Sequence, residues 1–282
     1  MIIKWLDLTK VYFPGLSTAI FQACSTGVLI VFEIYFFCGM EIPYWMSRTQ
    51  LMLGDEEVKR LMNAHVLVVG LGGVGGICAE MIARAGVGKM TIVDADTVDP
   101  SNRNRQIPAL KSTEFQPKAD VMARRLLDIN PELQLTVFPE YIKEERTREI
   151  LAKGNFDFVC DCIDTLSPKV NLIKACLASR IPLVSSMGAG GKSDPTKLEI
   201  IDISETYNCN LAKYVRKYLL RSGIRKGVTC VFSSELADQS RIITTEKAYP
   251  KKSIIGTVSY MPTIFGCACA SVAIRRIAGI PV

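Results

Sequence analysis

The fold is decided by the stretch Ala64-His-Val-Leu-Val-Val-Gly-Leu-Gly-Gly-Val-Gly-Gly76. Its first half is a short β-branched run, which predicts a buried parallel strand over residues 64–70. Its second half is a glycine-rich turn that leads into a helix expected over residues 74–85. Such a turn brings backbone N–H groups and the helix N-terminus against phosphate oxygens. The stretch therefore predicts a nucleotide site whose glycines are Gly70, Gly72, Gly73 and Gly75.

Beyond this turn, expected strands and helices alternate regularly along the chain. Strands are expected over residues 89–94, 134–138, 157–161 and 182–186, and helices over 113–129, 143–152 and 168–178. This alternation predicts an α/β fold of the Rossmann type, with a largely parallel sheet covered by helices on both faces. Further strands over 197–203 and 228–233 flank a basic helix over 210–221, which predicts mixed strands near the C-terminus. A last, apolar helix over 262–277 is expected to be buried.

The composition is that of an ordinary globular chain. Of the 282 residues, 49% are hydrophobic and 22% are charged, and the net charge of +6 permits an anionic partner without requiring one. No Cys-x-x-Cys pair occurs among the ten cysteines, so a zinc site is not expected. The only histidine, His65, stands at the mouth of the first strand and is expected to be structural. Any chemistry must therefore run without a histidine base.

The first 45 residues do not match the rest of the chain. Residues 16–40 are almost continuously apolar, and Glu33 interrupts them. Three interpretations stay open: a membrane anchor, an uncleaved signal-like segment, or translated sequence upstream of a later start at Met40 or Met46. We favour the later start. Residues 1–45 are therefore treated as an extension and 46–282 as the globular domain. The expected location is cytoplasmic, with membrane association through residues 16–40 if the segment is an anchor.

Polar groups follow the second expected strand in a dense cluster. Asp94 ends that strand and suits the hydroxyls of a ribose. The stretch Asp94-Ala-Asp-Thr-Val-Asp-Pro-Ser-Asn-Arg-Asn-Arg-Gln106 and then Lys118 add carboxylates, amides and cations just past the sheet edge. A dehydrogenase needs no such cations near its phosphates, but an enzyme that cleaves a triphosphate does. Asp164, after the strand over 157–161, is placed to hold Mg²⁺. The cluster favours ATP over NAD. Asp96 could bind the nucleotide or only cap a turn.

Several segments carry a resemblance to a known superfamily. The sequence resembles the ThiF, MoeB and ubiquitin-activating enzymes, which adenylate carboxylates, and within them the family of tRNA threonylcarbamoyladenosine dehydratases (TcdA, also called CsdL). The resemblance covers roughly residues 47–278. Besides the glycine turn and its cluster, the supporting segments are 47–54, 129–132, 161–169, 188–195, 230–235 and 256–259. It implies that residues 46–282 are a ThiF-type adenylating domain.

The resemblance also implies roles for individual residues. Gly73 matches the glycine that packs against the phosphates, and Asp94 the acid that binds ribose. Asn102 and Arg105 match a phosphate-facing pair. Lys118 matches a phosphate-binding lysine.

Two further positions extend the implied site. Asp164 matches the aspartate linked to Mg²⁺, and Arg48 matches an arginine that reaches into the site of a second subunit. The implied catalytic residues are thus Arg48, Arg105, Lys118 and Asp164, the nucleotide ligands also include Asp96, and the implied assembly is a homodimer.

The implied activity is ATP-dependent: the threonyl carboxylate of the modified tRNA adenosine is adenylated, and its activated carbonyl is attacked from within the same side chain, closing a ring. Sulfur-transfer proteins are candidate partners. The alternatives are an adenylyltransferase for a sulfur-carrier protein, a nicotinamide dehydrogenase and a non-catalytic binding module. Some dehydratases carry a cysteine just before the segment that matches Gly256, but residues 251–255 contain none. Cys230 is another candidate for a covalent step, although its apolar strand favours a core role.

Overall fold

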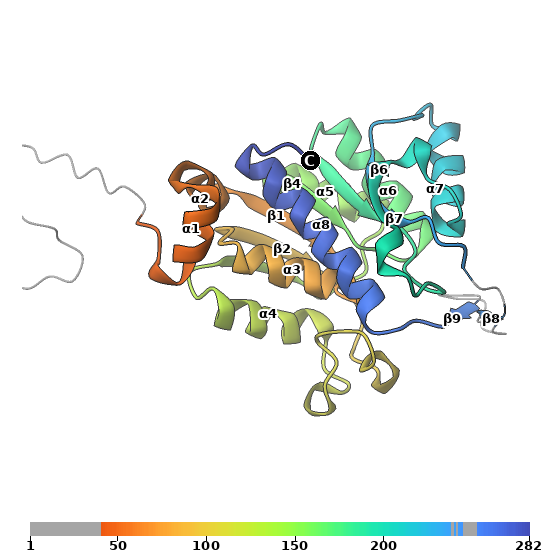
Figure 1. The fold of residues 1–282 in the computed structure, drawn as a ribbon, viewed down its shortest axis with the longest axis horizontal. Coiled ribbons are helices and arrows are strands. Elements are labelled where there is room, and N and C mark those ends of the chain that lie inside the picture. Colours follow the sequence, from red (N-terminus) through yellow and green to blue (C-terminus); the bar gives the residue numbers. More distant parts are fainter. Residues whose placement is uncertain (1–40, 238–239, 241, 245–252) are drawn as a thin grey trace, which may run out of the picture. The chain divides into compact units, whose positions relative to one another are not determined.

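A computed structural model of the chain describes residues 41–237, 240, 242–244 and 253–282. The apolar segment over residues 16–40 lies outside these residues, so its interpretation and the division of the chain at residue 45 stay predictions. The described part is built on one sheet of seven strands in the order β3-β2-β1-β4-β5-β7-β6 (Figure 1). The strands of this sheet are β1 (His65–Val69), β2 (Lys89–Val93), β3 (Gln134–Phe138), β4 (Phe158–Asp161), β5 (Leu183–Ser186), β6 (Leu198–Asp202) and β7 (Thr229–Ser233).

The sheet is parallel except at one edge. Neighbouring strands from β3 to β7 pair in parallel, and β6 pairs antiparallel with β7. This confirms the prediction of mixed strands near the C-terminus. A separate antiparallel pair consists of β8 (Ile242–Thr244) and β9 (Ser253–Ile255). The predicted α/β fold with a largely parallel sheet is confirmed.

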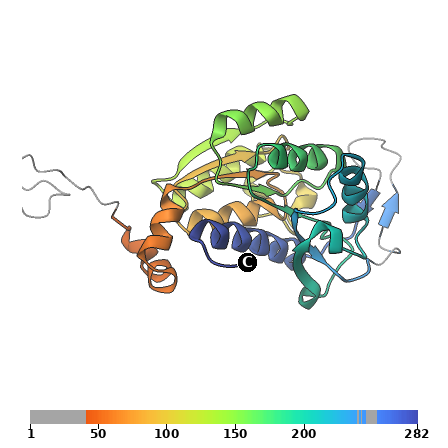
Figure 2. The same ribbon diagram turned by 90° about the horizontal axis from the view of Figure 1, so that it is seen from above.

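Eight α-helices accompany the strands in the described residues. They are α1 (Ser47–Leu53), α2 (Asp55–Asn63), α3 (Gly75–Arg84), α4 (Lys118–Ile129), α5 (Glu144–Gly154), α6 (Leu166–Ala178), α7 (Asn210–Arg221) and α8 (Tyr260–Ala278). Helices α3, α4 and α8 cover one face of the sheet, and α5, α6 and α7 cover the other (Figures 1 and 2).

The alternation of side chains along each central strand creates two cores. In β1, Val66 and Val68 pack with α3, α4 and α8, whereas Leu67 and Val69 pack with α5 and α6 on the opposite face. All four side chains are buried, and each contributes about 1.5–3 kcal/mol through removal from water. A strand buried on both faces must be apolar throughout, which explains the continuous β-branched run.

Helix α8 lies in the first core. Among the described helices it alone is long and apolar enough to cross a membrane, but Phe265, Cys269 and Val272 pack into the sheet. At Gly266 the backbone comes so close to α3 that a Cβ atom would lie 2.4 Å from the carbonyl oxygen of Val74. The expectation that this helix is buried is confirmed.

One helix begins later than its sequence predicted. The helix expected over 113–129 starts at Lys118. Phe115 has a φ of 67°, a left-handed conformation that a helix cannot include. Its N–H donates to the carbonyl of Val98 at 2.9 Å instead, and Pro117 caps the helix that follows. Helices α1 and α2 had not been assigned from the sequence.

The strand order creates a topological switch point between β1 and β4. The chain proceeds from β1 outward to β2 and β3, then returns to β4 on the other side of β1. At such a switch point the connections leave the sheet in opposite directions, and ligands bind at the carboxyl ends of the strands. The glycine turn after β1 and the loop after β4 lie at this point (Figure 1).

Candidate nucleotide-binding site

The glycine turn has a geometry that only glycine allows at two positions. Gly70 has a φ of 88°, and its N–H donates to the carbonyl of Val93 on β2 at 2.8 Å. A Cβ atom on Gly75 would lie 1.7 Å from the carbonyl oxygen of Gly70. The turn thus folds back on itself and starts α3, whose N-terminus has no side-chain cap. Its N–H groups are therefore suited to an anionic ligand.

The other glycines of the turn differ in what surrounds them. A Cβ on Gly72 would meet nothing closer than the side-chain nitrogen of Gln106, at 3.7 Å. On Gly73 it would lie 2.8 Å from the Cβ of Pro262 in α8, so this glycine is required by packing. The open side of the turn is at Gly72. Beside it, the buried Oε1 of Gln106 has no hydrogen-bond partner among the described residues, which leaves a polar group for a bound molecule.

Asp94 lies where β2 ends and is tied to the glycine turn. Its carboxylate accepts hydrogen bonds from the N–H of Leu71 at 2.6 Å and from the N–H of Asp96 at 2.8 Å. Burial raises the pKa of Asp94, while Lys118 and the two N–H donors oppose that shift. Both oxygens keep further acceptor capacity, so the carboxylate can receive ribose hydroxyls as the sequence predicted.

Lys118 is buried, not a surface charge. Its ammonium pairs with the Asp96 carboxylate at 2.9 Å, and the exposed fractions of the two side chains are 5% and 73%. The N–H of Lys118 also donates to the carbonyl of Asp96 at 2.9 Å. Asp96 therefore positions the lysine beside Asp94. A buried ammonium with one exposed carboxylate partner is available to a phosphate chain.

Asn102 and Arg105 belong to a tight loop after β2. Asn102 is buried, and its side-chain oxygen accepts from the N–H of Asp99 at 3.2 Å. Arg105 donates to the carbonyl of Ser101 at 3.0 Å and to the side chain of Asn104 at 2.7 Å. Asn104 in turn donates to the carbonyl of Thr257 at 3.0 Å. The loop is thus fastened to the segment before α8.

Asp164 is exposed in the loop after β4, and a buried network supports that loop. Asp161 accepts from the Lys169 ammonium at 2.7 Å, from the Ser185 hydroxyl at 2.6 Å and from the N–H of Ile163 at 3.1 Å. The side chains of Asp161 and Lys169 are fully buried. Burial raises the pKa of Asp161, and the Lys169 ammonium opposes the rise. The carbonyl of Cys162, between Asp161 and Asp164, lies against Gly70.

Arg48 does not join the other predicted residues within one chain. It is exposed on α1, next to Met46, which packs onto Gly86 ahead of β2. Helices α1 and α2 therefore lie at the amino ends of the strands (Figure 1). The glycine turn lies at the carboxyl ends of the strands. The two ends of the five-residue strand β1 are roughly 13 Å apart.

His65 also lies at the amino ends of the strands. Its ring contacts the hydroxyl of Thr91 at 2.9 Å and packs on the ring of Phe156 at 4.4 Å between centroids. Its structural role agrees with expectation. Cys230 is fully buried in β7, and burial raises the pKa of its thiol. Cys230 is thus enclosed in the core, and His65 lies at the edge of the sheet opposite the glycine turn.

Three residues of the site were not singled out from the sequence: Asn104, Gln106 and Lys169. All three stand inside the quoted segments, but only the fold shows what each contacts. In the part of the chain that the structure describes, no group of three His, Cys, Asp or Glu residues could hold a metal ion. Asp164 is a single carboxylate, which suits Mg²⁺ only together with phosphate oxygens.

The fold and the glycine turn at the end of β1 are those of a nucleotide-binding α/β protein. The model of the ThiF family matches residues 46–282, and the chain belongs to this family. It is 47% identical over 189 residues to the tRNA threonylcarbamoyladenosine dehydratase of Bacillus subtilis (strain 168), covering 67% of this chain and 74% of the relative. The enzyme of the same name from Escherichia coli (strain K12) is 39% identical over 201 residues, covering 68% and 75%.

A solved structure agrees with these relatives. The crystal structure of the Escherichia coli dehydratase TcdA in complex with ATP is 34% identical in sequence and superposes with a TM-score of 0.74. The match covers 83% of this chain and 93% of that one. The resemblance found in the sequence is therefore confirmed.

Proposed function

We propose that this chain is an ATP-dependent tRNA threonylcarbamoyladenosine dehydratase. The observation that carries the proposal is the identity of 47% and 39% to two dehydratases, along most of the ThiF domain. The geometry supports it, because the glycine turn, Asp94 and Lys118 lie together at the carboxyl ends of the strands, as an ATP site would require. The ATP complex of the Escherichia coli structure supports the choice of nucleotide.

ATP fits the residues present. The open side of the turn at Gly72 would receive the phosphates, and Asp94 at the end of β2 would receive the ribose. Lys118 and Arg105 would stabilise the negative charge that develops on the phosphates during the transfer. Mg²⁺ held by Asp164 and phosphate oxygens would neutralise further charge.

The chemistry requires positioning and charge stabilisation. The threonyl carboxylate attacks the α-phosphorus of ATP, which forms an acyl-adenylate and releases pyrophosphate. The activated carbonyl is then attacked from within the same side chain, AMP leaves, and the product has lost one water. The attacking carboxylate is already ionised, so the first step needs no general base. This agrees with a site that contains no histidine.

A homodimer is part of the proposal. Arg48 lies at the end of the sheet opposite the glycine turn of its own chain, so only a second subunit could bring it to a site. Sulfur-transfer proteins would be further partners.

The proposal is tested with purified protein, ATP and tRNA that carries threonylcarbamoyladenosine. Mass spectrometry of the digested nucleosides should show loss of one water from the modified adenosine, and only when ATP is present. An unchanged nucleoside with a folded, ATP-binding protein would reject the proposal. ATP–pyrophosphate exchange that responds to a Gly-Gly-tailed carrier protein instead of tRNA would favour the sulfur-carrier adenylyltransferase.

A further inference from the structure

A small pocket opens at the carboxyl ends of β5 and β7, beside the nucleotide site on the same edge of the sheet. Its volume is about 260 Å³, less than ligand pockets that hold a whole drug-sized molecule. Strand β5 is the immediate neighbour of β4, which carries the Asp164 loop. The lining includes the backbone of Gly188 and Gly190, the start of α7 and three cationic side chains.

The charge of this pocket is entirely positive. Lys192, Lys213 and Arg216 line it, and no Asp or Glu does so among the described residues. Helix α7 begins there at Asn210, and no side chain caps its N-terminus. The partial positive charge of a helix N-terminus adds to that of the three cations. The pocket is therefore suited to an anion.

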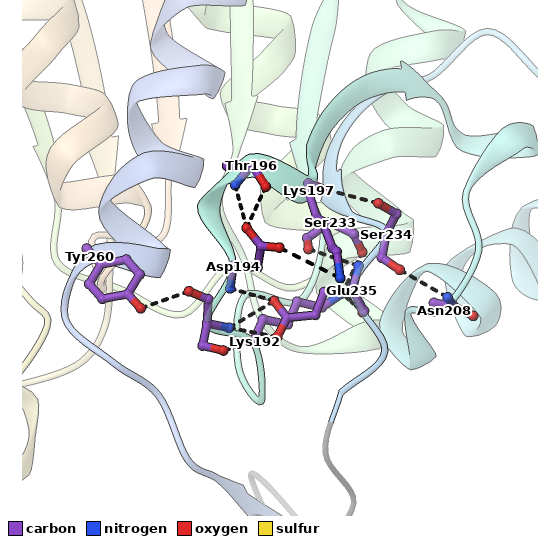
Figure 3. Close-up of polar contacts among 10 residues, drawn as sticks. Lys192, Asp194, Thr196, Lys197, Asn208, Ser233, Ser234, Glu235 and Tyr260 are labelled. Carbon is purple, nitrogen blue, oxygen red and sulfur yellow. Dashed lines mark hydrogen bonds and ion pairs between the residues drawn. The ribbon is translucent and has the colours of Figure 1, made fainter.

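Lys192 is the deepest of these cations. The residue is 5% exposed, and its ammonium donates to the carbonyls of Ser233 at 2.5 Å and Glu235 at 2.8 Å (Figure 3). Two of its three N–H groups are thus used by neutral acceptors. Burial lowers the pKa of Lys192, and the nearby Cys209 thiol and Glu235 carboxylate oppose the shift only in part.

The carboxylate of Glu235 does not neutralise this lysine by an ion pair. Its Oε2 accepts from the N–H of Ser193 at 2.9 Å and from the N–H of Asp194 at 2.8 Å, the second of which is drawn in Figure 3. These bonds fix the loop that carries Lys192. On the far side, Arg216 is held by hydrogen bonds to the carbonyl and hydroxyl of Thr206. Lys192 and Arg216 are thus held in place by neutral groups of the protein, so binding an anion would cost little entropy for ordering these two side chains.

We propose that this pocket is an oxyanion subsite that binds one backbone phosphate of the RNA substrate, close to the modified adenosine. The inference rests on the proposed function, which brings RNA to this edge of the sheet. A phosphate fits the volume and the positive lining, and the threonyl carboxylate is required at the nucleotide site instead.

The test combines a protein substitution with a chemical change in the RNA. Lys213 is exposed on α7, so Lys213→Gln removes one lining charge without disturbing the core. Lys217→Gln is the matched control: it lies one helical turn further on, is also exposed, and does not line the pocket. The substrates are anticodon stem-loops with the modified adenosine, in which single phosphates near that nucleoside are replaced by neutral methylphosphonates.

We expect one methylphosphonate to raise the KM of the wild type for RNA roughly tenfold, and to raise that of Lys213→Gln by a clearly smaller factor, because the two changes share the contact between Lys213 and that phosphate. The dependence of log KM on log salt should become shallower by about 0.7–0.9 in Lys213→Gln, while Lys217→Gln behaves like the wild type. The KM for ATP should stay unchanged.

Two results would overturn the subsite. The first is that Lys213→Gln and every methylphosphonate tested change the KM for RNA independently, so that their effects on log KM simply add. The other is an equal effect of Lys217→Gln, which would indicate general attraction by the surface of α7. In both cases conversion of the stem-loop by the wild type would leave the proposed function intact. If the wild type converted neither the stem-loop nor intact modified tRNA, the proposed function would be rejected, and the subsite with it.

Discussion

The two substitutions Gly75→Ala and Gly72→Ala should separate the folding role of the glycine turn from its binding role. A Cβ on residue 75 would lie 1.7 Å from the carbonyl oxygen of Gly70, whereas real Cβ atoms essentially never approach another heavy atom within 3.0 Å. The turn must therefore move by roughly 1.5 Å. Overpacking of this kind costs about 1–3 kcal/mol of stability, and we expect the upper end because the contact is with backbone. A 1 Å displacement alone costs on the order of 100-fold in rate.

Gly72→Ala is the matched control, which should weaken ATP binding and leave the stability nearly unchanged. The nearest atom to its Cβ is 3.7 Å away, so the free energy of unfolding should change by no more than about 0.5 kcal/mol. The methyl group would occupy the side of the turn where we place the phosphates. Loss of a hydrogen bond to a charged group costs about 1.5–3 kcal/mol, so ATP should bind at least about 10-fold more weakly.

The assays are urea unfolding for stability and calorimetric titration with ATP for affinity. Gly75→Ala should lose both stability and ATP binding, and Gly72→Ala should lose ATP binding alone. The reasoning would be refuted if Gly72→Ala bound ATP as tightly as the wild type, or if Gly75→Ala kept its full stability.

Three more predictions follow from the same contacts. Burial lowers the pKa of His65, so the native state prefers the neutral ring: stability should be complete above pH 6.5 and fall as pH drops through the lowered pKa. NMR titration of this single histidine checks the shift, and a pKa at or above 6.5 contradicts it. Lys169→Met should lower the free energy of unfolding by about 3–5 kcal/mol, because it leaves Asp161 buried without its cation. Urea unfolding measures this loss, and a loss under about 1 kcal/mol would show that the network is not important for stability. Mixing inactive Arg48→Ala and Lys118→Ala chains should restore about a quarter of the active sites through heterodimers of a two-fold dimer, and no recovery after subunit exchange would argue against a shared site.

Much of this site could be predicted because its signals are local. The glycine turn directly follows β1, and Asp94 and the loop to Arg105 directly follow β2. The carboxyl ends of parallel strands meet at one edge of a sheet, so these groups lie together. Gly75 illustrates the strength of the signal, because a Cβ there is excluded by its own turn.

The parts that could not be predicted depend on long-range contacts. Nothing near Lys118 in the sequence indicates that its ammonium is buried and held by Asp96. The buried network of Asp161, Lys169 and Ser185 joins β4, α6 and β5, which only the fold brings together. The late start of α4 follows from the left-handed Phe115, and phenylalanine has no preference for that conformation.

The central claim is that this nucleotide site activates a carboxylate on tRNA. The most direct measurement is the conversion of threonylcarbamoyladenosine in tRNA by the purified chain, with AMP and pyrophosphate followed alongside the nucleoside. The account predicts one AMP and one pyrophosphate for each nucleoside that loses water, and none of these products without the modified tRNA. ATP binding by a folded protein that leaves the nucleoside unchanged would contradict it.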